Sequence, residues 1–426
     1  MATAVAAAPD PLVSANDETL RVPVPQPRLA SIDLLRGAVM ILMALDHTRR
    51  FLTGLSFAPE DLLHTSGPLF FTRIVTHSCA PVFFMLAGTS AFLAVSHGKS
   101  VAQVSRFLWT RGLWLLLLDL SVIGYAWTFV FPFVQGGVIW ALAWSMIAMA
   151  LIVRLPMRWI AALGIGIVVT HNLFDRVVPA DLGNFSWLWF ILHRPGAFWI
   201  QPGRLSFFVS FPIVPWVGVM AIGYALGALL LRQDRRKLLF ALGAILTLAF
   251  FVLRAFNLYG NSSPALQPVL ADSAGPWKVQ PTLTLTIVSF FNTLKFPPSL
   301  QFLLMTLGPS LLLLAWFDRM TLDKIVPDKG LAKVLLVFGR VPLFFYVIHL
   351  YLIHTAAVWI SLAMHQPTAW LLYGGFLLRP VPNGYGHGLL FIYIAWVIFL
   401  ALLYYPCRWF MNLKQQHRDW RWLSYI

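Results

Sequence analysis

Residues 31–52 read SIDLLRGAVMILMALDHTRRFL, a largely apolar run about as long as a membrane-spanning helix requires. The run nevertheless contains six ionisable side chains, namely Asp33, Arg36, Asp46, His47, Arg49 and Arg50. An ionisable group inside a bilayer is costly unless it is paired or faces a cavity. The stretch therefore predicts a membrane helix with a polar face, and its charged side chains are candidates for a functional site.

The spacing within this helix brings Arg36 and His47 onto one face. They are eleven residues apart, which at about 3.6 residues per turn is close to three whole turns and about 16 Å of helix. Asp33, Met40 and Met43 lie on the same stripe. A phosphate-bearing ligand could bind Arg36 while its reactive end lies near His47, which exchanges a proton near neutral pH. The alternative is that Arg36 reaches lipid headgroups and His47 only packs.

The composition extends the membrane interpretation to the whole chain. Of 426 residues, 59% are hydrophobic and only 11% are charged, whereas a soluble protein carries roughly 25% charged residues. Neither a soluble domain nor a disordered chain has this composition. The net charge of +15 fits cytoplasmic loops against anionic lipid rather than nucleic acid. The two cysteines, Cys79 and Cys407, provide neither a disulfide framework nor a metal pattern. The predicted fold is all-α, polytopic and integral to a membrane.

The apolar runs predict about ten spanning helices, and the distribution of Lys and Arg between them indicates their orientation. We expect them at residues 31–53, 69–95, 107–130, 136–153, 157–172, 207–231, 237–257, 297–317, 341–364 and 388–411. With the N-terminus in the cytoplasm, 21 of the 31 Lys and Arg residues lie on the cytoplasmic side, which favours both termini there. The apolar segments 284–296 and 370–378 are too short to cross and would be re-entrant or interfacial.

The predicted domains follow from these spans. Residues 1–30 are Pro/Ala-rich and predict a disordered cytoplasmic tail, residues 31–411 form the membrane domain, and residues 412–426 form a cytoplasmic C-terminal tail. The outer loops 171–206 and 258–296 are long enough to be either binding surfaces or passive connectors.

The second predicted helix also carries polar groups. Arg73, His77 and Pro81 follow a four-residue spacing, and Pro81 leaves a backbone carbonyl free near His77. This pattern indicates a polar cavity, although a packing kink with a hydrogen-bonded histidine explains it equally well. In a later predicted helix, His349 shares a face with Tyr346.

Two ion pairs are expected among the remaining membrane charges. Asp46 should pair with Arg50, one turn on in the first helix, and Arg254 is a candidate partner for Asp119. The chain has no Walker loop, HExxH, GxSxG or dinucleotide fingerprint. ATP-driven transport, zinc proteolysis and elbow-type serine hydrolysis therefore have no support in the sequence.

Two segments carry a family resemblance, RLASIDLLRGAVMILMALDHTRRFL at 28–52 and FFTRIVTHSCAPVFFMLAGTSAFL at 70–93. They resemble the bacterial heparan-alpha-glucosaminide N-acetyltransferase-like membrane family, within the transmembrane acyltransferase superfamily. Residues 295–319, 339–354 and 405–426 also look like that family. In the related acyltransferase family three, the first helix carries a basic residue, ten residues of any kind and a histidine needed for acyl transfer. Arg36, residues 37–46 and His47 fit that spacing.

The resemblance implies transfer of an acyl group, usually acetyl from coenzyme A, from the cytoplasmic side to a carbohydrate amine or hydroxyl on the far side. His47 would be the general base, or less readily a transient acyl carrier. His77 and Arg73 would steady the developing oxyanion or orient the substrate.

The same resemblance predicts where the donor binds. Arg36, with Asp33 on its stripe and with Arg106 and Arg111 from the first inner loop, would hold the phosphates of acetyl-CoA. No metal is expected. The expected partners are membrane lipid and a carbohydrate or glycoconjugate acceptor, without nucleic acid, and a homo-oligomer is left open. The expected location is the bacterial inner membrane.

The chain departs from the lysosomal branch of the family, which carries Asn where His47 stands and has its reactive histidine in the first lumenal loop. His64 lies in that loop here, but its surroundings, DLLHTSGPLF, do not match, so no role is assigned to His64. The base therefore stays open between His47 and another histidine. A transporter or flippase for a sugar or lipid-linked substrate, and a non-catalytic scaffold, remain alternative functions.

Overall fold

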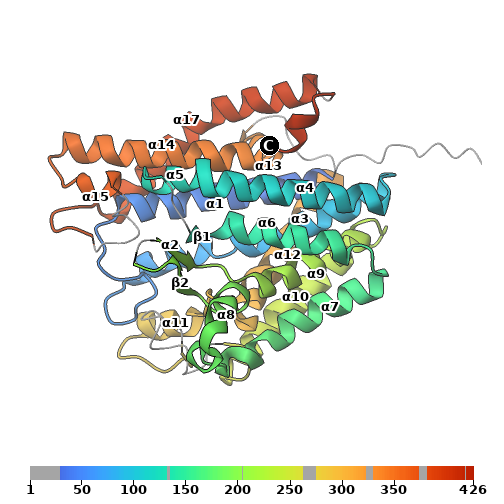
Figure 1. Ribbon diagram of the computed structural model, residues 1–426, viewed down its shortest axis with the longest axis horizontal. Helices are drawn as coiled ribbons and strands as arrows, with labels where there is room; N and C mark the ends of the chain where they lie inside the picture. The colour runs from blue at the N-terminus through green and yellow to red at the C-terminus, as the bar shows by residue number, and fades with distance from the viewer. Residues whose placement is uncertain are drawn as a thin grey trace, which may run out of the picture.

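The computed structural model describes residues 29–131, 135–203, 205–261, 275–322, 330–373, 381–417 and 419–426. The predicted disordered tail lies almost wholly outside the described residues. The described chain is mainly helical, and most of its long helices run roughly along the longest axis of the molecule (Figure 1). This is the all-α polytopic architecture that the sequence predicts.

The helices of the first half of the chain are α1 (Ala30–Leu52), α2 (Gly67–Thr76), α3 (Cys79–Ser96), α4 (Val101–Leu118), α5 (Gly124–Thr128), α6 (Val138–Ile152), α7 (Met157–Thr170), α8 (Ser186–Leu192), α9 (Ile213–Leu230) and α10 (Arg235–Ala255). Those of the second half are α11 (Leu283–Phe291), α12 (Leu300–Leu322), α13 (Gly330–Arg340), α14 (Pro342–Ala363), α15 (Ala369–Leu372) and α17 (Leu389–Gln416). Three short 3₁₀ segments are η2 (His171–Arg176), η3 (Pro179–Phe185) and η5 (Arg421–Ser424).

Eight helical segments of the described chain are long and apolar enough to cross a membrane. They do not include α1, because it carries too many charges, or α6, because it has only 15 residues. The outward faces of α10 and α17 are apolar, with Leu248 64% and Leu390 73% exposed. Exposed apolar faces of this extent are stable against lipid.

Every predicted span is helical over most of its length, but several boundaries are wrong. The predicted span 69–95 is interrupted at His77–Ser78, because Pro81 has no N–H to bond the His77 carbonyl. The span 107–130 contains a π-helical turn, Asp119–Ile123, between α4 and α5. The predicted start at 207 is also wrong, since α9 begins only after Pro212.

Further differences lie near the C-terminus. Helix α13 was not predicted; it is separated from α14 by Val341, and Pro342 then begins the next helix. Helix α17 continues to Gln416 rather than 411, and η5 follows it. The C-terminal residues fold back onto α4, where the Tyr425 and Thr110 hydroxyls lie 2.8 Å apart.

Helix α1 is the centre of the bundle and packs against α2, α3, α12, α13, α14 and α17. Helices α3 and α9 pack closely because small residues lie where they meet. A Cβ atom at Gly88 or Gly223 would overlap the backbone of the facing helix. Any residue larger than glycine at these two positions would force α3 and α9 apart.

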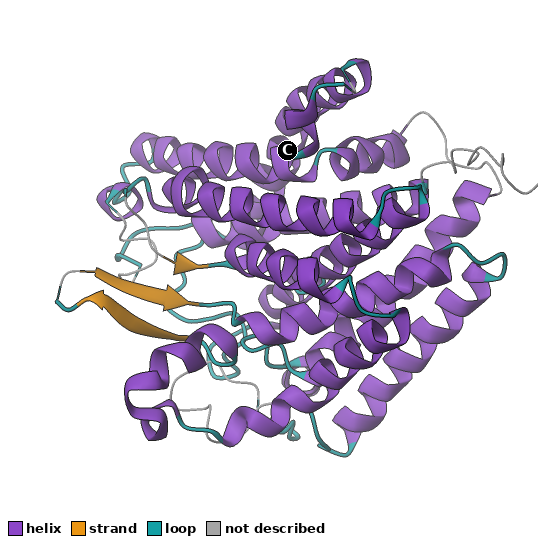
Figure 2. Cartoon of the chain, turned by 45° about the vertical axis from the view of Figure 1, so that its right-hand side comes forward, coloured by secondary structure: helices purple, strands orange, loops and turns teal. Residues whose placement is uncertain are grey.

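A small sheet lies at one end of the helical body (Figure 2). Its strands are β1 (Gln135–Gly136), β2 (Gly196–Gln201) and β3 (Leu205–Val209), in the order β1-β3-β2. β2 and β3 form an antiparallel hairpin, and β1 pairs in parallel with β3. The predicted outer loop 171–206 is thus a folded unit of η2, η3, α8 and the hairpin.

Candidate active site

A cavity of about 770 Å³ runs along α1. Arg36, Met40, Met43 and His47 line it, so four of the five residues on the predicted stripe share one lane. The fifth, Asp33, is buried behind Arg36 and does not line the cavity. The Arg36 guanidinium and the His47 imidazole therefore face the same cavity, three helical turns apart.

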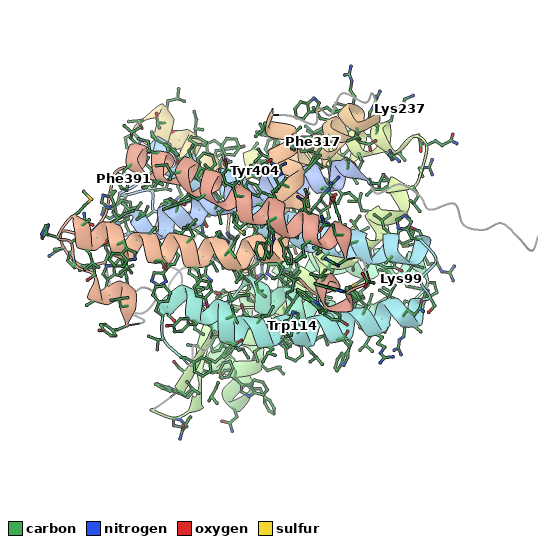
Figure 3. The ribbon with its side chains drawn as sticks, turned by 90° about the horizontal axis from the view of Figure 1, so that it is seen from above. Lys99, Trp114, Lys237, Phe317, Phe391 and Tyr404 are labelled. Atoms are coloured by element: carbon green, nitrogen blue, oxygen red, sulfur yellow. The ribbon has the colours of Figure 1, made fainter. Side chains whose placement is uncertain are left out.

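The end of the cavity beside Arg36 is strongly basic. Within the described part of the chain, five basic side chains line it: Arg36, Lys99, Arg111, Arg340 and Lys414. Lys99 and Arg111 approach the Phe107 ring, at 5.6 and 5.7 Å from its centroid. Lys99 lies at the end of the molecule opposite Phe391 (Figure 3).

Among the described residues, three oxygen atoms accept hydrogen bonds from Arg36. Its guanidinium donates to Asp33 Oδ1 and the Gly339 carbonyl at 3.2 Å, and to Ser90 Oγ at 3.3 Å. Arg340 lies 3.6 Å from the other oxygen of Asp33. Asp33 therefore orients two of the cations instead of facing the ligand space itself.

Of the four residues predicted to bind the donor, Arg106 is not brought to this site. Its side chain is exposed on α4, and it does not line the cavity, whereas Arg111 does. The two residues are five positions apart, so they point to different faces of the helix.

Between its two ends the cavity is mostly apolar. Phe83, Phe84, Leu115 and Met146 line this middle part. Such an apolar stretch accepts an uncharged chain but disfavours the passage of a hydrated ion.

His47 forms a histidine pair at the far end of the cavity. His47 Nδ1 and His349 Nε2 are 2.6 Å apart, and His349 Nδ1 lies 3.0 Å from the Phe345 carbonyl. The two rings are inclined by 14° with centroids 4.9 Å apart, as expected for an edge-to-edge hydrogen bond rather than face stacking. The Trp127 ring meets His47 edge-on at 4.9 Å.

This geometry fixes the tautomer of both rings when they are neutral. The Phe345 carbonyl can only accept, so His349 must donate from Nδ1 and keep a lone pair on Nε2. His47 must then donate from Nδ1 to that lone pair. The Nε2 atom of His47 is left as a proton acceptor, which is the state that a general base requires.

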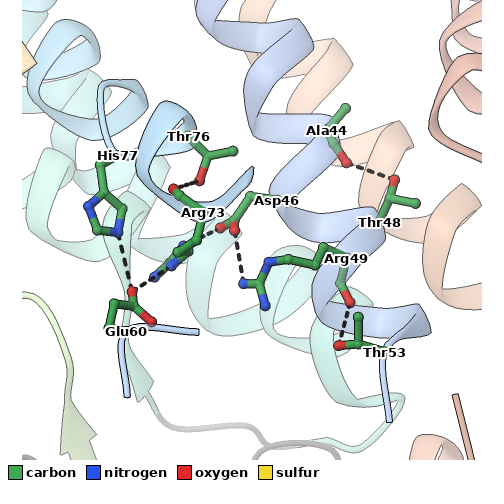
Figure 4. Close-up of polar contacts among 9 residues, drawn as sticks. All are labelled: Ala44, Asp46, Thr48, Arg49, Thr53, Glu60, Arg73, Thr76 and His77. Atoms are coloured by element: carbon green, nitrogen blue, oxygen red, sulfur yellow. Dashed lines mark hydrogen bonds and ion pairs between the residues drawn. The ribbon is translucent and has the colours of Figure 1, made fainter. Parts of the chain in front are cut away.

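A charged cluster lies beside His47 and is built from α1, α2 and the loop between them (Figure 4). Arg73 Nη1 donates to Asp46 Oδ2 at 2.7 Å, and Arg73 Nε donates to Glu60 Oε1 at 2.8 Å. Arg49 donates to the second oxygen of Asp46 at 3.0 Å. His77 Nε2 lies 3.3 Å from Glu60 Oε1. The predicted pair Asp46–Arg50 is therefore wrong, because Arg49 and Arg73 bind Asp46 instead.

His77 and Glu60 both line the cavity. His77 is 1% exposed, and its Nδ1 atom has no hydrogen-bond partner among the described residues. Burial alone would raise the pKa of Glu60, but Arg73 and the hydrogen bond with His77 hold it well below its usual range. Glu60 is thus a permanent anion, and the Asn292 side chain donates to its carbonyl at 2.8 Å.

Lys295 is a cavity residue that the sequence analysis did not select. It forms no ion pair among the described residues, and its ammonium lies 5.2 Å from the Phe296 centroid. Burial, together with the charge of Arg73, lowers the pKa of Lys295 to about 8. It therefore carries a positive charge at neutral pH that no carboxylate of the described chain compensates by direct contact.

The second predicted ion pair, Asp119–Arg254, is also wrong. Arg254 donates to the carbonyls of Ser289 and Asn292 at 2.8 Å, and so binds the last carbonyl groups of α11. Asp119 lines the active-site cavity, which Arg254 does not. His64 pairs with Asp61 at 2.5 Å in the exposed loop and does not line the cavity.

The comparison with known families agrees with the resemblance in the sequence. The family model for the catalytic domain of heparan-alpha-glucosaminide N-acetyltransferase matches residues 28–263. No curated protein matches the chain. The matched region begins just before α1 and continues past α10, so it contains Arg36, His47, Glu60, Arg73 and His77. Because it covers more than half of the 426 residues, the chain belongs to the heparan-alpha-glucosaminide N-acetyltransferase catalytic family of membrane acetyltransferases.

Proposed function

We propose that the chain transfers an acetyl group from acetyl-CoA, bound at the Arg36 end of the cavity, to a carbohydrate amine or hydroxyl at the His47 end. The observation that carries this proposal is the shared cavity of about 770 Å³, which has a cluster of cations at one end and an oriented histidine pair at the other. Together these features provide an anchor and a base.

The residues at the Arg36 end fit the donor. Arg36, Lys99 and Arg111 offer guanidinium and ammonium groups for phosphates, and the apolar middle part of the cavity suits an uncharged pantetheine arm. When bound, acetyl-CoA supplies an activated thioester. Five cations around one opening also attract a polyanionic donor from solution.

The His47 end fits the acceptor reaction. His47 Nε2 takes the proton of the acceptor hydroxyl or amine as the new C–O or C–N bond forms. It returns that proton to the thiolate sulfur as the C–S bond breaks, so atoms and charges balance. His349 holds His47 in the required tautomer, and Lys295 with Arg73 faces the oxyanion that develops on the carbonyl.

We further propose that the Arg36 end faces the cytoplasm of a bacterial inner membrane. The positive-inside count supports this orientation, since 21 of 31 Lys and Arg residues fall on that side. Helix α1 begins at this end, and Ile426 lines the same part of the cavity beside Lys414, so both described ends of the chain lie together.

The decisive experiment is acetyl transfer in proteoliposomes by the His47→Ala variant. With acetyl-CoA as donor and glucosamine as probe acceptor, we expect transfer to fall by about 10²–10⁴-fold, as for loss of a general base. His64→Ala is the matched control and should keep wild-type turnover, because His64 lies outside the cavity. Undiminished turnover of a folded His47→Ala protein would remove His47 from the mechanism.

Binding separates the enzyme from a transporter. We expect acetyl-CoA to raise the melting temperature of the detergent-solubilised protein, since a ligand stabilises the state to which it binds. Stabilisation by a sugar but not by acetyl-CoA would instead favour transport of a solute through the same cavity.

A further inference from the structure

A second polar cluster lies outside the active-site cavity, where α7 and α8 end. His171 and Asp175 belong to η2, which directly follows α7, and His193 follows α8. One ligand-type atom from each side chain lies within 4.8 Å of the others. The three residues are 2%, 2% and 4% exposed. They therefore converge in a buried site although two separate segments contribute them.

The protein contacts of this cluster are incomplete. His193 Nε2 and Asp175 Oδ1 are 2.9 Å apart, and Asn172 donates to the other oxygen of Asp175 at 2.9 Å. By contrast, neither ring nitrogen of His171 has a hydrogen-bond partner among the described residues. The Pro298 carbonyl gives the ring only a weak polar contact that falls short of full hydrogen-bond geometry. A buried imidazole held by so weak a contact is costly, and a ligand would compensate it.

We propose that His171, Asp175 and His193 bind one divalent metal ion, with Zn²⁺ as the best fit. Two imidazole nitrogens and one carboxylate oxygen form a borderline donor set that suits zinc, and three protein ligands leave one tetrahedral position for water. The ion takes the place of the proton now shared between His193 and Asp175, and it gives His171 its missing partner.

Asn172 supports this assignment as an orienting residue. Its amide nitrogen holds the Asp175 carboxylate, and its oxygen accepts from the Leu300 backbone N–H at 2.9 Å. Metal-binding carboxylates are commonly oriented by such an outer hydrogen bond. Asn172 and Asp175 also line a separate cavity of about 340 Å³, which offers the ion a path to the site.

The metal would act as a structural staple. It joins the end of α7 to the end of α8, and Asn172 connects both to the start of α12; α7 and α8 lie next to each other in Figure 1. The chain then continues from His193 into β2 and β3, and Ser210 and Phe211, directly after β3, line the active-site cavity. The bound metal would therefore hold in place the segment that lines the acceptor end of the cavity. This proposal does not depend on the proposed transfer reaction.

Metal content tests the proposal. Protein from cells grown with added ZnCl₂, purified in detergent without chelator, should contain about one zinc per chain by inductively coupled plasma mass spectrometry. His171→Ala and Asp175→Asn should each lower this content at least tenfold. His64→Ala is the matched control and should retain the zinc, because Asp61–His64 is an exposed pair that belongs to no three-residue cluster among the described residues.

The proposal also makes predictions that do not depend on the folding of the variants. Chelation of the wild-type protein with EDTA should lower its melting temperature, and ZnCl₂ should restore it. X-ray absorption at the zinc edge should show nitrogen and oxygen ligands at about 2.0–2.2 Å, without sulfur. Wild-type protein that contains no metal after zinc supplementation would overturn the proposal and leave the cluster as a polar core in which Asp175 interacts with Arg194. Zinc that persists in folded His171→Ala and Asp175→Asn would overturn it as well.

Discussion

The two ends of the active-site cavity are built in opposite ways. At the Arg36 end, five basic side chains line the opening, and the nearest acid, Asp33, is buried behind them. At the His47 end, cations and anions alternate, since Asp46 and Glu60 flank Arg73, and two imidazoles are hydrogen bonded to each other. One end has excess charge, whereas the other has fixed geometry.

The difference indicates a division of labour. Excess positive charge binds a polyanion with little demand on its exact position, and it accelerates capture. A network of paired charges contributes little net charge but holds the reacting groups in one arrangement. Substitutions at the His47 end should therefore act on folding and on kcat, whereas those at the Arg36 end should act on KM for the donor.

The largest effect is expected for Arg73→Gln. The change leaves Asp46 and Glu60 buried without their shared partner, which costs about 3–5 kcal/mol of unfolding free energy. Chemical denaturation in mild detergent measures this loss. Adding Glu60→Gln should recover part of it, because the second change removes one of the two carboxylates that have lost the charge of Arg73, while Asp46 keeps its ion pair with Arg49. Additive losses in the double variant would show that the two residues do not act as a pair.

A smaller effect, on rate alone, is expected for His349→Ala. Without the acceptor at its Nδ1 atom, His47 can adopt the wrong tautomer, and we expect kcat to fall about 10²-fold while KM for acetyl-CoA stays constant. His349→Gln should restore part of the rate, since an amide oxygen can accept from His47. Equal rates for the Ala and Gln variants would show that the histidine pair does not orient the base.

The Arg36–His47 lane could be predicted because it depends on one helix. Both residues belong to α1, and the regular rise and rotation of a helix determine how they lie relative to each other. The ten apolar segments were predictable for the same local reason. The free carbonyl near His77 was predictable from Pro81, but the break into two helices at His77–Ser78 was not, because Pro81 is compatible with either a kink or a new helix start.

The partners of these residues could not be predicted, because they come from distant parts of the chain. His349 is 302 positions from His47, and Glu60 and Lys295 lie in loops whose path no periodicity describes. The cluster of His171, Asp175 and His193 was not predicted either, although His171 and Asp175 are only four residues apart. Its third member, His193, joins only through the fold of the outer loop.

A pH profile tests the charge of Lys295. Since burial lowers its pKa to about 8, the ammonium is intact below that pH and is lost as the pH rises through it. Transfer should then decline about tenfold per pH unit above 8. Between pH 8 and the ordinary Lys pKa of 10.5, Lys295 holds its proton in the unfolded chain but not in the folded one. The free energy of unfolding should therefore rise with pH over this interval. In Lys295→Met this rise should disappear, whereas Lys295→Arg should keep activity at pH 9.

The smallest effects are expected at the Arg36 end, where several cations contribute to donor binding. Arg111→Gln should raise KM for acetyl-CoA about threefold, at constant kcat, because one partly exposed charge contact contributes roughly 0.6 kcal/mol. The increase should shrink at high salt as the remaining charges are screened. Arg106→Gln removes the same charge from the same helix but from its exposed face, so KM should not change. Equal increases for both variants would mean that the donor is held by the general charge of this surface, and the cavity would then no longer define its binding site.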